Sequence, residues 1–260
     1  MSEYIPKKSL GQHWLNDVDT LDAIVKGAGV TANDTVVEIG PGLGTLTKLL
    51  LATGAQVIAI EFDESLLGHL RAKYAHQPNF QLVHGDVLNY DFSQLPKDYK
   101  IVANIPYYLT SQLLRILSDM PNKPISADLL MQKEVTERVC SNPPDMSILA
   151  VAMQIEYSAT AGLFVAAKMF TPPPKVDSLV LHVERLAKSF IAEDNKKDFM
   201  RVVKAGFSAK RKMLRNTLNA GLKMPKEDVE NLLNKLQIEP TRRAETLSLD
   251  EWQLLFKNLK

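Results

Sequence analysis

Short apolar runs alternate with helix-period stretches through the first two thirds of the chain, and this alternation limits the fold more than any other feature. Thr35–Ile39 and Gln56–Ile60 are predicted to be buried strands, with a helix over Thr45–Ala52 between them. Further strands are expected at Phe80–His84, Lys100–Ala103, Asp128–Gln132, Ala152–Thr160 and Ser178–Val183, and further helices at Val18–Ala28, Glu64–Tyr74, Ser111–Asp119 and Lys133–Cys140. Such alternation is typical of an α/β domain with a mainly parallel sheet.

The strand pattern ends near Arg185, and the remainder of the chain is helical in period. We therefore expect an α/β domain over residues 1–187 and a small helical domain over residues 188–260.

Charge is unevenly distributed in the helical part. Between Lys196 and Lys223 there are nine Lys or Arg residues and one acidic residue, Asp198. If this segment is one amphipathic helix, its basic stripe consists of Arg201, Lys204, Arg211 and Arg215. The stripe indicates either a phosphate-binding surface or a solvated face, and the excess of one sign favours the first.

Composition excludes several classes of protein. The formal net charge of the 260 residues is +1, so total charge argues neither for nor against nucleic acid. The single cysteine, Cys140, rules out a disulfide scaffold and a Cys-rich zinc site, and it suits a reducing compartment. No uncharged apolar run approaches the roughly 20 residues of a membrane span, and no signal peptide is recognisable. We expect a cytoplasmic protein with no metal site and no membrane contact.

A glycine-rich turn, Gly40-Pro41-Gly42-Leu43-Gly44, joins the first predicted strand to its helix. Glycines such as Gly40 and Gly42 let the backbone approach a ligand, and the helix N-terminus offers free N–H groups. The next strand ends at Glu61, 21 residues after Gly40, which is the spacing at which a carboxylate meets ribose hydroxyls. Thr45 stands where a dinucleotide fingerprint has a glycine, and the G-x-G-x-G form is usual in S-adenosylmethionine methyltransferases. The alternative interpretation is that these glycines only form a tight strand-to-helix turn that binds no ligand.

A third polar position follows the next predicted strand. The Asp86 carboxylate can accept a hydrogen bond from an adenine amine at the carboxyl edge of the sheet. With Gly40 and Glu61 it lines one crevice, and the three positions together predict S-adenosyl-L-methionine as the cofactor.

The tetrad Asn104-Ile105-Pro106-Tyr107 follows the fourth of these strands. An adenine N6 amine is a poor nucleophile because its lone pair is delocalised into the ring. Acceptors such as the Asn104 amide oxygen and the Ile105 carbonyl favour a pyramidal nitrogen with an available lone pair. Pro106 fixes the turn, and Tyr107 can stack on the base. In isolation the tetrad is a turn with a core tyrosine, but its place after this strand favours a catalytic role.

The chain resembles the rRNA adenine N6,N6-dimethyltransferase family, specifically the bacterial KsgA type. The matching segments are Gly11–Leu15, Glu38–Thr45, Glu61, Asp86, Asn104–Tyr107, Phe170–Ser178, Lys210–Leu218 and Arg243–Glu245. The resemblance implies a Rossmann-like S-adenosylmethionine methyltransferase sheet with a small all-helical C-terminal domain that binds rRNA. It implies dimethylation of two adjacent adenosines in a hairpin of small-subunit rRNA, on an immature subunit during ribosome assembly. We expect the enzyme to be a monomer.

The resemblance also implies roles for single residues. It adds His13 and Leu15 to the cofactor-binding set of Gly40, Gly42, Glu61, Asp86 and Asn104. It implies that Tyr107 and Phe170 sandwich the extruded adenine. The basic residues expected to contact RNA are Arg201, Lys204, Lys210, Arg211, Lys212 and Arg215. Two positions depart from the family pattern, because Trp14 replaces the usual phenylalanine and Tyr108 stands where many members have asparagine.

Three alternatives remain at this point. The related Erm-type enzymes methylate one adenosine of large-subunit rRNA, and the basic segment around Lys210 and the Arg243–Glu245 segment argue against that assignment. A DNA adenine methyltransferase would need a domain for reading bases in a duplex, which the sequence does not indicate. A ribosome-assembly factor that acts chiefly by binding would not need the intact cofactor and tetrad motifs.

Overall fold

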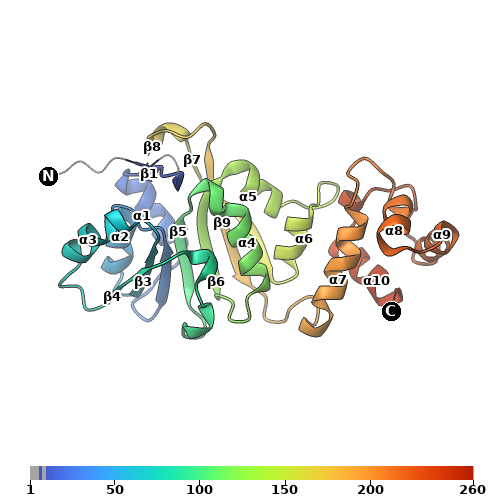
Figure 1. Ribbon diagram of the computed structural model, residues 1–260, viewed down its shortest axis with the longest axis horizontal. Helices are drawn as coiled ribbons and strands as arrows, with labels where there is room; N and C mark the ends of the chain where they lie inside the picture. Colours follow the sequence, from blue (N-terminus) through green and yellow to red (C-terminus); the bar gives the residue numbers. More distant parts are fainter. Residues whose placement is uncertain (1–5, 8–9, 260) are drawn as a thin grey trace. The chain divides into compact units, whose positions relative to one another are not determined.

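The computed structural model describes residues 6–7 and 10–259 (Figure 1). The chain divides into two compact units, the first made of residues 1–137 and 158–185 and the second of residues 138–157 and 186–260. This division differs from the predicted domains because residues 138–157 and 186–187 belong to the second unit.

In the part of the chain that the structure describes, the first unit is built on a seven-stranded sheet with the strand order β4-β3-β2-β5-β6-β9-β7. In chain order the strands are β2 (Thr35–Ile39), β3 (Gln56–Glu61), β4 (Phe80–His84), β5 (Lys100–Asn104), β6 (Ser126–Gln132), β7 (Tyr157–Val165) and β9 (Ser178–Arg185). Neighbours from β4 to β6 pair in parallel, and β9 pairs antiparallel with β6.

Helices connect β2 to β3, β3 to β4 and β5 to β6, as the alternation predicts, and others precede β2 and follow β6. They are α1 (Val18–Gly27), α2 (Thr45–Ala52), α3 (Glu64–Lys73), α4 (Thr110–Asp119) and α5 (Lys133–Val139), with 3-10 turns at Val87–Asn89, Phe92–Gln94, Tyr107–Leu109 and Ala167–Met169. Val36 and Val57 pack with residues of α1, α2 and α3, while the alternate residue Val37 is also fully buried. Both faces of these strands are therefore covered, which explains their continuous apolar runs. No helix among the described residues is long and apolar enough to span a membrane.

The strand order reverses between β2 and β5. The chain runs outward from β2 through β3 to β4 and then returns to β5 on the other side of β2. At such a reversal the connections leave in opposite directions, and the carboxyl ends of the two strands border a crevice. A small separate sheet pairs β1 (Trp14–Leu15) antiparallel with β8 (Phe170–Thr171). It fastens the N-terminal segment, the described residues before α1, to the proline-rich loop, residues 170–176.

The second unit is helical. Its helices are α6 (Ile148–Gln154), α7 (Glu193–Gly206), α8 (Leu214–Leu222), α9 (Lys226–Lys235) and α10 (Leu249–Asn258), with a 3-10 turn at Ala244–Thr246. The fully buried Trp252 stacks on Phe207 with ring centroids 5.7 Å apart. Gly206 lies so close beneath the indole that a Cβ there would be 2.4 Å from Cη2 of Trp252, so this position requires a glycine.

A buried ion pair ties the segment 138–157 to this unit. Lys196 Nζ lies 3.1 Å from Glu156 Oε1, and both side chains are less than one-tenth exposed. The backbone N–H of Met146 also donates to the Glu245 carbonyl at 2.9 Å. Since an unpaired buried charge is costly, the pair fixes where this segment packs.

The predicted strand Ala152–Thr160 is wrong over its first half. Helix α6 ends at Gln154, and β7 begins only at Tyr157. The Ser147 side chain caps α6 by accepting from the Ala150 N–H at 3.0 Å. Periodicity alone does not distinguish a short buried helix from a buried strand. Here the Ser147 cap favours the helix. The other strands and helices predicted for the first two thirds agree within two residues.

The predicted single basic helix is also wrong. Helix α7 ends at Gly206 and α8 begins at Leu214, so the proposed stripe is divided between two helices and a loop. Arg201 and Lys204 are exposed on α7, whereas Lys210, Arg211 and Lys212 are exposed on the loop.

Candidate active site

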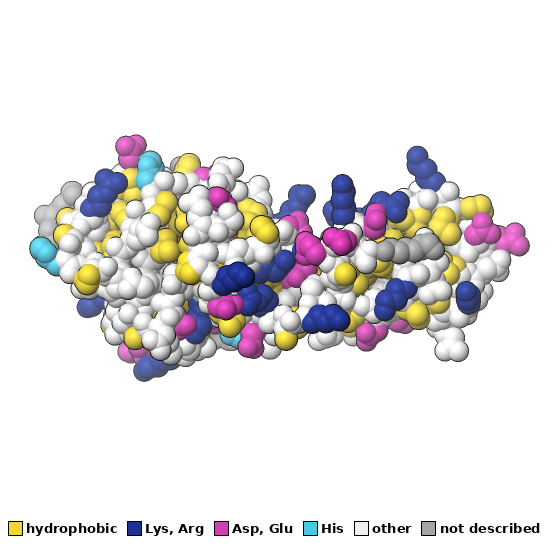
Figure 2. Space-filling view, turned by 90° about the horizontal axis from the view of Figure 1, so that it is seen from below, with side chains coloured by type: hydrophobic (Ala, Val, Ile, Leu, Met, Phe, Trp, Pro, Cys, Tyr) yellow, Lys and Arg dark blue, Asp and Glu magenta, His cyan; other side chains and the backbone are white. Residues whose placement is uncertain are grey.

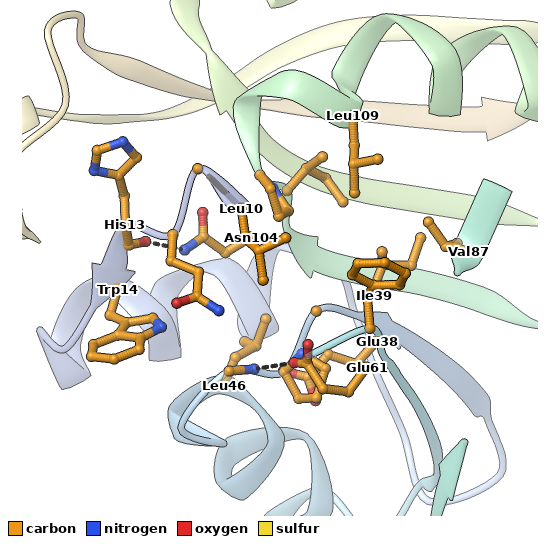
Figure 3. Close-up of a pocket in the computed structure, with 18 of the residues that line it drawn as sticks. Leu10, His13, Trp14, Glu38, Ile39, Leu46, Glu61, Val87, Asn104 and Leu109 are labelled. Carbon is orange, nitrogen blue, oxygen red and sulfur yellow. Dashed lines mark hydrogen bonds between the residues drawn. The ribbon is translucent and has the colours of Figure 1, made fainter. Parts of the chain in front are cut away.

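A pocket lies at the reversal of strand order, where loops that follow four parallel strands meet the N-terminal segment (Figure 3). The space within it, including the open mouth, is about 970 Å³. All seven residues predicted to bind the cofactor line it, namely His13, Leu15, Gly40, Gly42, Glu61, Asp86 and Asn104.

The glycine-rich turn presents bare backbone to this pocket. Gly40 and Gly42 have positive φ angles of 65° and 58°, a conformation that side-chain-bearing residues rarely adopt. A Cβ on Gly42 would also lie 3.2 Å from the indole nitrogen of Trp14. Both the turn and the neighbouring ring therefore require a glycine here.

Glu61 is held rigidly at the pocket wall. Its Oε2 accepts from the Gly42 N–H at 3.1 Å and its Oε1 accepts from the Asp63 N–H at 2.7 Å (Figure 3). The residue is 5% exposed, and burial raises the pKa of its carboxyl despite these two backbone donors. The carboxylate is thus oriented in advance toward donors that a ligand brings.

Asp86 is oriented by the turn that follows β4. Its carboxylate accepts from the Leu88 N–H at 2.9 Å and from Asn89 Nδ2 at 3.0 Å, so it caps a 3-10 turn. Since it also lines the pocket, the same carboxylate is placed to accept from a ligand amine.

The tetrad after β5 supplies acceptors. Asn104 Nδ2 donates to the His13 carbonyl at 3.2 Å, which orients the amide and presents its oxygen as the remaining acceptor (Figure 3). Ile105 is buried, and its N–H donates to the Leu130 carbonyl at 3.0 Å. Ile105 and Pro106 line the pocket as well.

Tyr107 joins the tetrad to the proline-rich loop. Its hydroxyl lies 2.8 Å from Ser178 Oγ, and its ring centroid lies 5.5 Å from that of His13. His13 Nδ1 lies 2.7 Å from the Pro172 carbonyl oxygen. Three segments distant in sequence therefore meet at one corner of the pocket.

Phe170 is not among the pocket-lining residues. It is 3% exposed, pairs with Leu15 between β1 and β8, and belongs to the core cluster of the first unit. Its role in stacking stays a prediction, and it requires the ring to leave this core.

The structure adds pocket residues to which the sequence assigned no role there. Glu38, Phe62 and Tyr108 line the wall, and Trp14 places beside them a buried indole N–H that has no hydrogen-bond partner among the described residues. A carboxylate in the middle of the apolar Thr35–Ile39 run was the available signal for Glu38, because such a group is normally buried only with a partner.

The predicted RNA-contacting residues all lie in the second unit. Arg215 differs from the others, since its guanidinium pairs with Glu230 at 3.0 Å and is partly buried. On the face shown in Figure 2, Lys and Arg side chains of the helical unit are dispersed among acidic ones. In sequence, the exposed loop residues Lys210, Arg211 and Lys212 form the longest run of basic residues in the described part of this unit.

Glu38 provides a pH-dependent test of the pocket's interior. Burial raises the pKa of its carboxyl from 4.5 to about 8, against a hydrogen bond from Thr47 Oγ1 at 2.6 Å. Because the folded protein holds a proton that the unfolded chain releases, the free energy of unfolding should fall as the pH rises from about 4.5 to 8. Glu38→Gln should remove up to about 1.4 kcal/mol per pH unit of this dependence in denaturant titrations. Glu64→Gln, at an exposed carboxyl, is the control, and equal pH profiles for Glu38→Gln and the unmodified protein would contradict the assignment.

Comparison with known proteins identifies the family. Residues 6–260 match the ribosomal RNA adenine dimethylase family. Two relatives named ribosomal RNA small subunit methyltransferase A are similar over most of their length. The one from Dehalococcoides mccartyi is 38% identical, covering 96% of this chain and 87% of the relative, and the one from Synechocystis sp. is 40% identical, covering 95% and 94%.

Solved structures agree in fold. A dimethyladenosine transferase from Plasmodium falciparum superposes with a TM-score of 0.84 at 28% identity, covering 95% of this chain and 97% of that one. The 23S rRNA methyltransferase ErmE superposes with a TM-score of 0.78 at 26% identity, covering 95% and 99%. These neighbours confirm the predicted Rossmann-like methyltransferase fold with its helical C-terminal part. The chain belongs to the ribosomal RNA adenine dimethylase family and is an rRNA adenine methyltransferase.

Proposed function

We propose that this enzyme uses S-adenosyl-L-methionine to convert two adjacent adenosines in a hairpin of small-subunit rRNA to N6,N6-dimethyladenosine. It acts as a monomer, in the cytoplasm, on the immature small subunit during ribosome assembly. The observation that carries the proposal is the convergence of the Gly40–Gly42 turn, Glu61, Asp86 and the Asn104–Tyr107 tetrad on a single pocket.

The residues present fit this cofactor. The backbone at Gly40 and Gly42 is bare, the Glu61 carboxylate can accept from ribose hydroxyls, and that of Asp86 can accept from the adenine amine. His13 and Leu15 would close the cofactor site from the N-terminal side.

The chain's own contribution to the reaction is to orient and activate the target amine. When bound, S-adenosyl-L-methionine supplies a methyl group that its sulfonium charge has already activated. The Asn104 amide oxygen and the Ile105 carbonyl accept from the two N–H bonds of the adenine amine, which favours a pyramidal nitrogen with an exposed lone pair. Pro106 fixes the turn that presents this carbonyl. Because positioning does most of the work, no strong general base is required.

Tyr107 is placed to hold the extruded base. Its hydrogen bond to Ser178 and its proximity to His13 fix the ring at the pocket corner, where stacking can contribute roughly 1–3 kcal/mol. Phe170 completes a sandwich once its ring turns out of the core cluster.

The choice of the small subunit is supported by the relatives. Proteins named ribosomal RNA small subunit methyltransferase A are 37–40% identical to this chain, whereas the 23S rRNA methyltransferase ErmE is 26% identical. In the proposed complex the second unit supplies phosphate contacts through Arg201, Lys204, Lys210, Arg211 and Lys212, while Arg215 remains paired with Glu230.

Methyl transfer from labelled S-adenosyl-L-methionine tests the proposal. Small subunits that lack the modification, large subunits and naked rRNA are compared, and the labelled nucleosides are identified. We expect dimethyladenosine on the small subunit alone. Glu61→Gln should lower kcat/KM about 10- to 100-fold, because hydrogen bonds to a charged acceptor contribute roughly 1.5–3 kcal/mol, and should leave subunit binding within about twofold. Label on large-subunit rRNA would instead indicate an Erm-type enzyme, and no transfer despite cofactor binding would indicate an assembly factor.

The basic loop should determine the salt dependence of subunit binding. Each phosphate contact contributes to the slope of log affinity against log salt, so Lys210→Ala with Arg211→Ala should flatten that slope by roughly 1–2. Arg215→Ala is the matched control, because this guanidinium is occupied by Glu230 and its loss should leave the slope unchanged. Slopes that respond to Arg215 and not to the loop would contradict the proposed surface.

A further inference from the structure

The N-terminal segment is tethered to a carboxylate that lies outside the candidate active site. Asp63 Oδ1 accepts from Lys7 Nζ at 2.6 Å, and Asp63 Oδ2 accepts from Gln12 Nε2 at 2.9 Å. Asp63 is 4% exposed and is not among the residues that line the main pocket. It follows Glu61 by one intervening residue and caps helix α3 by accepting from the Ser65 N–H at 3.0 Å.

This carboxylate stays ionised over the working pH range. Burial opposes ionisation, but the hydrogen bonds from Lys7, Ser65 and Gln12 outweigh it and lower the pKa of Asp63 to about 2. The contact with Lys7 therefore joins full charges, one of which is almost removed from water, and screening by solvent is weaker than at an open surface.

The same segment is fastened at its other end. Trp14 and Leu15 pair with β8, and His13 Nδ1 lies 2.7 Å from the Pro172 carbonyl oxygen. Between these attachments, the residues from Leu10 to Leu15 all line the pocket. The segment thus runs along the pocket wall from α3 to the proline-rich loop, and Asp63 anchors its first end.

We propose that Asp63 is a positioning residue for the cofactor. By holding Lys7 and Gln12 it keeps residues 10–15 against the pocket, so that His13 and Leu15 are in place before the cofactor binds. Preorganisation of this kind raises affinity because the entropic cost of ordering the segment is met on folding and does not reduce the binding free energy. The inference rests on the proposed use of this pocket by S-adenosyl-L-methionine, and it assigns Asp63 no contact with the cofactor.

Separating this role from the helix cap requires changing the partners of Asp63. Lys7→Ala removes the part of the tether that lies outside the pocket and leaves the hydrogen bond from Ser65 to Asp63 intact. Gln12→Ala removes the other part, but because Gln12 itself lines the pocket, its effect supports the inference only together with that of Lys7→Ala. Calorimetric titration of each purified variant with S-adenosyl-L-methionine should show a Kd about 3- to 10-fold higher than that of the unmodified protein. With saturating small subunits, KM for the cofactor should rise by the same factor and kcat should stay within about twofold. Lys26→Ala, which breaks a surface ion pair with Asp22 on α1, is the control and should leave Kd unchanged.

Asp63→Asn adds a coupling test. Once the carboxylate is neutral, Lys7→Ala should cause little further loss, so the double variant should bind within about twofold of Asp63→Asn alone. An unchanged Kd in Lys7→Ala, or losses that simply multiply in the double variant, would overturn the inference and leave the proposed function standing. Failure of the unmodified protein to bind S-adenosyl-L-methionine would contradict both.

Discussion

The reversal of strand order between β2 and β5 is the constraint on which the rest of this structure depends. Parallel strands place all their carboxyl ends on one edge, and the reversal leaves that edge open beside β2. Residues at and just after the ends of four different strands can then line one pocket. The cofactor turn, two carboxylates and the acceptor tetrad are brought together by topology, while the sheet itself is buried on both faces.

Three buried carboxyl groups lie in and beside the pocket, and each has a different set of hydrogen-bond donors. Glu38 is buried among apolar residues and keeps its proton to about pH 8, so it adds no charge near neutrality. Glu61 is nearly as buried but receives two backbone N–H groups, and Asp63 receives Lys7 and Gln12. Three acidic residues within one small region therefore have different environments: burial dominates at Glu38 and Glu61 and raises their pKa values, whereas the donors dominate at Asp63 and lower its pKa.

Much of the first unit could be predicted from the sequence, because its signals are local. The Thr35–Ile39 strand, the glycine turn and the Thr45–Ala52 helix follow from hydrophobic period and turn chemistry within a few residues. The structure also brings Glu61, Asp86 and the tetrad together, as their positions after strands indicate.

The errors have a different origin. A short apolar run does not distinguish helix α6 from a strand, and the basic segment is divided by a loop. The burial of Phe170 was not predictable either, because it depends on pairing with Leu15, which lies far away in sequence. The Asp63 tether joins side chains that lie far apart in sequence, so no local pattern predicts it.

Amide hydrogen exchange with and without S-adenosyl-L-methionine tests whether the segments that meet at this pocket bind the cofactor together. Our account predicts protection confined to residues 10–15, 40–45, 61–63, 85–88 and 104–107; protection that omits the glycine turn and residues 104–107, or that centres on the second unit, would contradict it.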